Sequence, residues 1–234
     1  MVTHQSKILP LENGDCEASR RHRLSRVEFE RRYQAMPEVK KAELIEGRVY
    51  IASPVRIIHG QPHAYIMTWL GVYCAATPRT QFADNTTVRL DTDNEPQPDA
   101  LLRIEGGQSQ IDVDDYVRGA PELIVEIATS TASYDLQEKL QVYRRNGVQE
   151  YLVWQVSDKP NGMASLRIFD WFRLQDGEYI KLQSEENIIK SQVFPGLWLA
   201  IDSLLNYDLA EVIATVQQGL ATKEHQDFVI EISN

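Results

Sequence analysis

The stretch that most constrains the fold runs from Pro121 to Val156 and places a helical pattern between two apolar runs. Leu123–Ala128 is rich in apolar and β-branched residues, which is typical of a buried strand. Tyr134–Asn146 has the periodicity of a helix, and Gly147 follows it in the position where glycine ends helices. Glu150–Val156 is the second apolar run. A strand–helix–strand unit of this kind predicts two parallel strands joined by a crossover helix, and therefore an α/β fold.

Glu126 interrupts the first of these apolar runs. A carboxylate without a partner in a dry interior costs several kcal/mol, so a buried Glu126 requires a partner, a proton or a metal ion. The alternative is that the strand has one solvent-facing side and that Glu126 lies on it, since successive strand residues point to opposite faces.

Composition narrows the class of protein. The chain has 234 residues and a net charge of −10, which argues against a broad basic surface for nucleic acid but leaves room for a local basic groove. Its two cysteines, Cys16 and Cys74, have no metal-binding or disulfide spacing, which fits a reducing compartment. Because we find neither an apolar run of about 20 residues nor a signal peptide, we expect a cytoplasmic protein without a membrane span.

The remaining chain predicts one domain with two extensions. We expect a flexible segment over residues 1–24, a folded domain over 25–205 and a helical extension over 206–234. Before the central unit we expect a short helix capped by Ser25, a hairpin turning at Glu46-Gly47 and a helix over Ile58–Ala76. A β-rich stretch over Thr80–Leu90 with a bend at Asp84-Asn85, a strand over Ala100–Ile104 and a loop over Gly106–Gly119 should follow. After the central unit we expect a hairpin turning at Gln175–Gly177 and a helix from Leu204 to about Gln218.

His59 and His63 are four residues apart, a spacing that can bind a metal ion on a helix. Gly60 and Pro62 lie between them and no further ligand motif accompanies them, so the signal is weak. The simpler interpretation is that the two histidines cap or pack the start of the helix.

Three residues suggest chemistry. Asp99 opens a short strand, Glu126 lies inside the next long one, and Lys139 lies on the following helix, close to the face that packs on the sheet. Mg²⁺ is typically held by one or two carboxylates, and a nearby lysine can stabilise charge during phosphodiester hydrolysis. The alternative for Lys139 is a simple surface pair with Asp135, four residues earlier.

The run P-E-L-I-V-E-I-A-T-S-T-A-S-Y-D-L-Q-E-K-L-Q-V-Y-R-R-N-G-V-Q-E-Y-L-V-W, together with P-D at Pro98-Asp99, resembles the Uma-two type restriction endonuclease family of the PD-(D/E)XK nuclease superfamily. The resemblance extends from about Glu43 to Leu197. It implies a restriction-endonuclease-like core, a mixed sheet flanked by helices, and a homodimer that cleaves DNA with Mg²⁺ or Mn²⁺.

The same resemblance assigns roles to individual residues. It implies that Asp99, Glu126 and the backbone carbonyl of Ile127 hold the metal, with Glu46 as a further candidate. Ala128 stands where the superfamily pattern places a lysine, and Lys139 on the following helix matches the migrated replacement. The sequence therefore predicts a metal-dependent endonuclease with Asp99, Glu126 and Lys139 as its catalytic residues. The alternative is a nuclease fold that has lost cleavage and acts in DNA binding or assembly.

Overall fold

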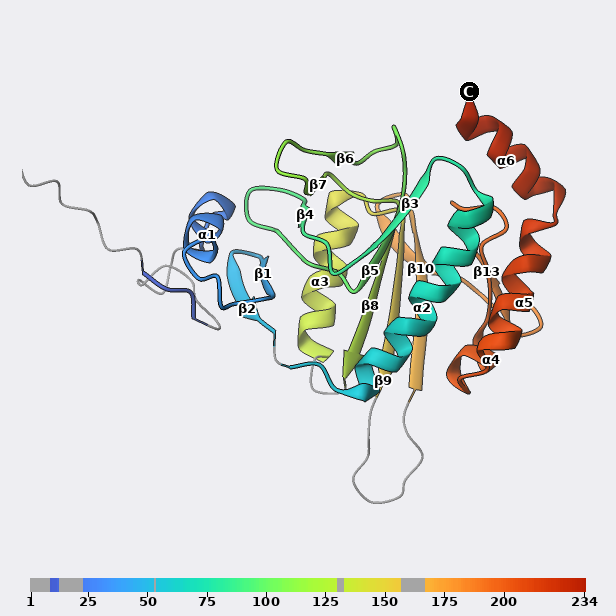
Figure 1. Ribbon diagram of the computed structural model, residues 1–234, viewed down its shortest axis with the longest axis horizontal. Helices are drawn as coiled ribbons and strands as arrows, with labels where there is room; N and C mark the ends of the chain where they lie inside the picture. Colours follow the sequence, from blue (N-terminus) through green and yellow to red (C-terminus); the bar gives the residue numbers. More distant parts are fainter. Residues whose placement is uncertain (1–8, 13–22, 53, 130–132, 157–166) are drawn as a thin grey trace, which may run out of the picture.

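A six-stranded sheet forms the centre of the computed structural model, which describes residues 9–12, 23–52, 54–129, 133–156 and 167–234 (Figure 1). The strand order is β11-β10-β9-β8-β5-β3. β8 and β9 pair in parallel, and the other neighbours pair antiparallel, so the sheet is mixed as expected. The strands are β3 (Thr80–Asp84), β5 (Ala100–Ile104), β8 (Leu123–Thr129), β9 (Glu150–Val156), β10 (Arg167–Gln175) and β11 (Glu178–Lys181).

The predicted strand–helix–strand unit is confirmed. Helix α3 (Ser133–Asn146) connects β8 to β9, whose parallel register begins at Leu123↔Glu150. Gly147 follows the helix with a φ of 84°, a value that glycine adopts without steric cost. The turn expected between Thr129 and Ser133 lies mostly outside the described residues.

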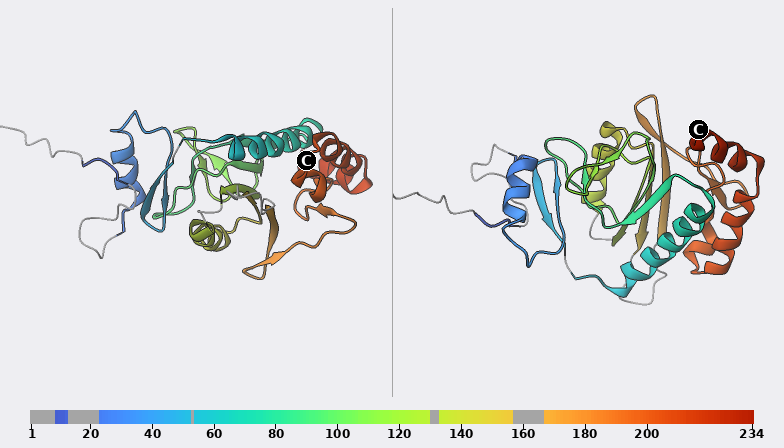
Figure 2. Two further views of the ribbon diagram at one scale, coloured as in Figure 1. Left: turned by 90° about the horizontal axis from the view of Figure 1, so that it is seen from below. Right: turned by 45° about the horizontal axis from the view of Figure 1, so that its top comes forward.

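Two helices cover opposite faces of the sheet, as Figure 2 shows. Helix α2 (Ile57–Ala76) packs on one face, where Val125 and Ile127 join the main hydrophobic core. Helix α3 packs on the other face, where Ile124 belongs to a second core with Tyr143. Because strand residues alternate, Glu126 shares the α3 face with Ile124. Glu126 is only 5% exposed, so the solvent-facing alternative for this residue is wrong.

A small lobe precedes α2 and lies to the left in Figure 1. It contains α1 (Arg26–Tyr33) and the hairpin of β1 (Ala42–Ile45) and β2 (Arg48–Ile51). Glu46 and Gly47 have φ values of 51° and 72°, the pair of positive angles that a tight two-residue hairpin turn requires. The side chain of Ser25 caps α1 by accepting from the Glu28 amide, as predicted. The segment 1–24, expected to be flexible, lies largely outside the described residues.

The expected loop over Gly106–Gly119 is instead partly a sheet. β6 (Gln110–Ile111) and β7 (Val117–Arg118) form a hairpin, and β7 also pairs in parallel with β4 (Val88–Arg89). These strands are two residues long and depend on pairing with a distant segment, so local sequence patterns give them no signal.

The C-terminal region also differs from the prediction. The single helix expected from Leu204 to about Gln218 is divided at Tyr207, whose φ is 60°, and the final residues form a further helix. Thr222 caps that helix, and His225 and Phe228 bury it against the body. The elements here are β12 (Ile188–Lys190), β13 (Trp198–Ala200), α4 (Ile201–Leu205), α5 (Leu209–Leu220) and α6 (Lys223–Ser233). Among the described residues, the helices are all too short or too polar to cross a bilayer.

Candidate active site

Asp99 and Glu126 meet on the α3 face of the sheet. β5 and β8 pair antiparallel with Ala100 opposite Val125, so Asp99 and Glu126 occupy the next facing positions and their side chains share one face. Both carboxylates are buried, with exposed fractions of 4% and 5%. Two acids far apart in the sequence therefore form one local cluster.

Lys139 reaches this cluster from helix α3. Its Nζ lies 2.9 Å from Oε1 of Glu126 and 2.9 Å from Oε1 of Glu43 on β1. The hydroxyl of Tyr143, one turn further along α3, donates to the same oxygen of Glu126 at 2.6 Å. The lysine therefore points inward. Its alternative partner, Asp135, lies outside the described side chains.

Asp99 is held by a second set of donors. The Ile127 amide donates to Oδ2 at 2.7 Å, and His59 Nε2 lies 3.2 Å from the same oxygen. Lys41 Nζ lies 3.5 Å from Oδ1. His63 Nε2 lies 2.7 Å from the backbone carbonyl oxygen of Asp99. The two histidines at the start of α2 thus contact Asp99, whereas the prediction was that they cap or pack the start of the helix, which has no side-chain cap.

The environment sets the protonation of these groups. Burial raises the pKa of Glu126 to about 7, against the attraction of the Lys139 ammonium. Burial alone would lower the pKa of Lys139, but the nearby carboxylates of Glu126 and Glu43 have a larger effect and raise it. For Asp99, burial is overcome by His59 and Lys41, so its pKa is lowered. The hydrogen bond to Asp99 raises the pKa of His59. At neutral pH, Asp99 is thus ionised and Lys139 is charged, while Glu126 lies close to its titration point.

The structure does not bring Glu46 to this cluster. The Glu46 carboxylate pairs with Arg23 at 2.7 Å and with Arg145 at 2.6 Å. Glu43, three residues before Glu46, lies in the cluster instead, and sequence reasoning missed it. A signal was available, because Glu43 is an acid within the apolar strand A-E-L-I, the same feature that singled out Glu126. Tyr143 and Lys41 were also missed as neighbours of the acids.

The donor set fits a hard divalent cation. Among the described residues, we find no group of three or more histidine, cysteine or acidic side chains arranged to hold a metal. Mg²⁺ needs less from the protein, since one or two carboxylates together with waters and substrate oxygens are its usual ligands. The buried carboxylates of Asp99 and Glu126 are oxygen donors of that kind and of that number.

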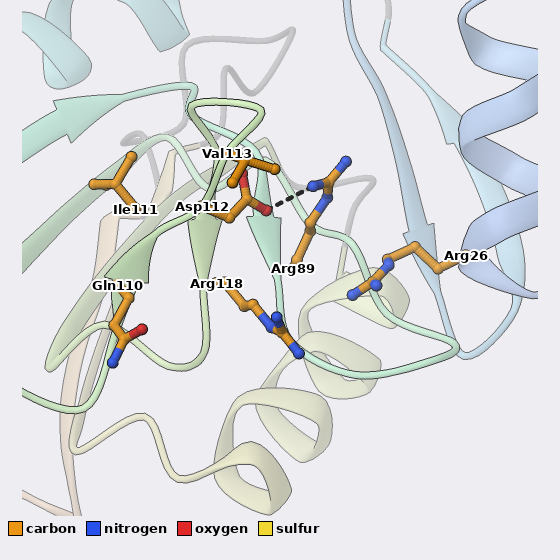
Figure 3. Close-up of a pocket in the computed structure, with 7 residues that line it drawn as sticks. All are labelled: Arg26, Arg89, Gln110, Ile111, Asp112, Val113 and Arg118. Atoms are coloured by element: carbon orange, nitrogen blue, oxygen red, sulfur yellow. Dashed lines mark hydrogen bonds and ion pairs between the residues drawn. The ribbon is translucent and has the colours of Figure 1, made fainter.

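A separate polar cavity of about 520 Å³ lies between α1 and the β4–β7–β6 sheet (Figure 3). Arg26, Arg89 and Arg118 line it. Arg89 pairs there with Glu30 at 2.9 Å, and also with Asp112 and Asp114. We assign these ion pairs a structural role, because they tie α1 to the loops that carry β4 and the β6–β7 hairpin.

The arginines at the end of α3 are also engaged within the protein. Arg144 pairs with Glu178, and Arg145 pairs with Glu46. Tyr143 and Trp154 are fully buried, which confirms that they belong to the core. Tyr143 and Trp154 are therefore not available at a surface for a ligand.

A mixed sheet covered by helices on both faces is the fold of a restriction-endonuclease-like protein. The chain belongs to the Uma2 family, whose model, described as "Putative restriction endonuclease", matches residues 27–202. Its fold is similar to a solved structure from Anabaena variabilis titled "a putative nuclease belonging to DUF820", with a TM-score of 0.57 and 14% identity over 76% of this chain and 97% of that one. A comparison with curated proteins gave no match.

Proposed function

We propose that this protein is a metal-dependent endonuclease that hydrolyses phosphodiester bonds of DNA, acting in the cytoplasm as a homodimer. The observation that carries the proposal is the convergence of Asp99, Glu126 and Lys139 from three separate elements. Membership of the Uma2 family supports the same reaction class.

The proposed roles follow from the contacts. Asp99, Glu126 and the Ile127 carbonyl would hold Mg²⁺ or Mn²⁺, which supplies charge neutralisation and an acidified water when bound. Lys139 keeps its ammonium beside Glu126, where it can orient the attacking water and stabilise negative charge. Tyr143 fixes the Glu126 carboxylate, and the Ile127 amide fixes that of Asp99. Glu43 balances the second side of the Lys139 charge.

The test is nicking of supercoiled plasmid in Mg²⁺ or Mn²⁺, extended to duplex, single-stranded and branched DNA. We expect the parent protein to nick and chelation by EDTA to stop it. Asp99→Ala and Glu126→Ala should abolish nicking, while Glu38→Ala, which changes an exposed acid, should not. Equal nicking by the parent and both site variants would assign the activity to another site or to a contaminant.

A second candidate is a nuclease fold that binds DNA or assembles without cleaving. One observation favours it: the Lys139 ammonium already lies 2.9 Å from both Glu43 and Glu126, so these acids have a cation partner from within the chain. Ala128, in place of the lysine of the superfamily pattern, agrees with it. This candidate predicts a salt-dependent shift of DNA in a gel with no cleavage in either metal.

A further inference from the structure

The outer side of the acidic cluster carries a second lysine, Lys41, just before β1. Its Nζ lies 2.7 Å from Oδ1 of Asn85 and 3.5 Å from Oδ1 of Asp99. We propose that Lys41 and Asn85 form a phosphate-binding site that grips the DNA backbone beside the candidate centre. This inference rests on the proposed function for its ligand, but it assigns residues that neither the sequence motif nor the acidic cluster includes.

The backbone fixes Asn85 at this place. Asn85 follows β3 with a φ of 44°, a left-handed conformation that asparagine tolerates better than most residues. Its amide N–H points to the carbonyl of Asp99 at 3.4 Å, at the end of the β3–β5 ladder where Asp84 pairs with Ala100. Oδ1 accepts from Lys41, and Asn85 is an exposed residue, so its side-chain NH₂ can donate to a bound ligand.

The two lysines near the acids differ in what their charge can reach. The Lys139 side chain is 10% exposed and has a carboxylate on two sides at 2.9 Å. The Lys41 side chain is 24% exposed, its short contact is to a neutral amide, and the Asp99 carboxylate lies 3.5 Å from its ammonium. Lys139 is therefore paired with buried carboxylates of the protein, whereas the ammonium of Lys41 can interact with a ligand at the surface.

Phosphate is the ligand that this pair suits. A lysine ammonium acts as a point charge for phosphate, and asparagine side chains donate to phosphate oxygens in protein–DNA complexes. The chain carries a net charge of −10, so a DNA strand must be held by local cations rather than by an overall field. A phosphate bound at Lys41 would lie next to Asp99, where the proposed cleavage takes place.

The salt dependence of DNA binding tests this site. Binding of a fluorescein-labelled duplex is measured by anisotropy in EDTA, for the parent, Lys41→Gln and Lys40→Gln. Lys40 is the matched control, because it is the adjacent lysine, is exposed and donates only to the Pro37 carbonyl among the described residues. Each lost phosphate contact should lower the slope of log affinity against log salt by about 0.9.

We expect Lys41→Gln to show that loss of slope, so that its affinity deficit relative to the parent shrinks about threefold between 50 and 200 mM salt. Lys40→Gln should keep the parent slope. Asn85→Gly, which keeps the left-handed backbone but removes the amide, should weaken binding without changing the slope. The proposal is overturned if Lys41→Gln keeps the parent slope, or if the parent does not bind the duplex.

The outcomes separate this inference from the proposed function. If the slope of log affinity against log salt depends on Lys41 but the protein does not cleave DNA in Mg²⁺, the phosphate site is supported and the proposed nuclease function is contradicted. If cleavage requires Asp99 but Lys41→Gln keeps the parent slope, the nuclease function is supported and the phosphate site is contradicted. Free inorganic phosphate as a competitor distinguishes the sources of the ligand: competition at millimolar concentration would show a site for the free anion rather than for a DNA strand.

Discussion

Lys139 and Glu126 face each other between α3 and β8, with the lysine Nζ 2.9 Å from Oε1 of the glutamate. The contact joins the crossover helix to the first strand of the unit that defines the fold. Both side chains are buried, so the stability of the fold and the proposed reaction depend on the same two residues. Substitutions here must therefore be measured for stability as well as for activity.

Removal of the Lys139 charge should destabilise the protein. Lys139→Met leaves Glu43 and Glu126 without their shared ammonium, and loss of one partner from a buried pair typically costs about 3–5 kcal/mol. Urea unfolding measures the change in the free energy of unfolding, and plasmid nicking measures activity. Gln137→Ala, at an exposed position of the same helix, should change stability by less than about 0.5 kcal/mol. Equal stability of the two variants would contradict the buried contact.

The early segment offers a direct comparison of two acids. Glu43→Gln should reduce nicking by about 10–100-fold, the range for residues that orient a site through a neighbour, because Glu43 holds Lys139 and accepts from the Gln97 amide. Glu46→Gln should leave nicking unchanged, because the arginines that pair with Glu46 among the described residues are exposed, and such pairs are worth about 0–1 kcal/mol. The reverse order of effects would restore Glu46 as the functional acid.

His59 should titrate above the ordinary histidine range. Its bond to Asp99 raises its pKa, so this pair stabilises the fold fully below the unfolded pKa of about 6.5 and loses the effect as pH rises through the raised value. NMR titration of the imidazole measures the pKa. In Asp99→Asn it should fall, while that of His225, which burial lowers, should stay below the ordinary value. An unchanged His59 pKa in the variant would mean that Asp99 is not its partner.

Glu126 should couple metal binding to pH. Burial raises its pKa to about 7, so the folded protein holds a proton there that the unfolded chain releases nearer 4.5. Stability contributed by this group therefore falls as pH rises from about 4.5 to 7. Because a metal must displace the proton, Mg²⁺ affinity should increase with pH through 7. Calorimetry in buffers of different ionisation enthalpy counts the released protons, and Glu126→Gln should release none. Proton-free binding to the parent would exclude Glu126 as a ligand.

The parts of the fold that the sequence predicts are those with local signals. The unit from β8 to β9 and the turns at Glu46-Gly47 and Asp176-Gly177 are set by apolar periodicity and by residues that accept positive φ. The β4–β7–β6 sheet and the break at Tyr207 have no such signal. Pairing of two-residue strands depends on tertiary neighbours rather than on their own propensity.

The cluster of acids shows a similar limit. The sequence singles out Glu126 as an acid in an apolar strand, and Asp99 and Lys139 from their positions and the family resemblance; the structure places Lys139 beside Glu126 and Asp99 at the facing strand position. Lys41 and Tyr143 could not be identified in that way. A lysine in a polar segment and a tyrosine on a buried helix face are common, and they become neighbours of the acids only when α3 packs between the hairpin and the sheet.

The β1–β2 hairpin forms a sheet of its own and is attached to α3 through side chains. Glu43 binds Lys139, Glu138 binds Arg48 and Tyr50, and Glu46 binds Arg145. Exposed charges are screened by dissolved ions within roughly 10 Å at 0.1 M, whereas buried pairs are screened much less. High ionic strength therefore weakens the outer attachments, while the buried Glu43–Lys139 pair and the backbone hydrogen bonds between Leu44 and Glu95 continue to hold the hairpin against the body.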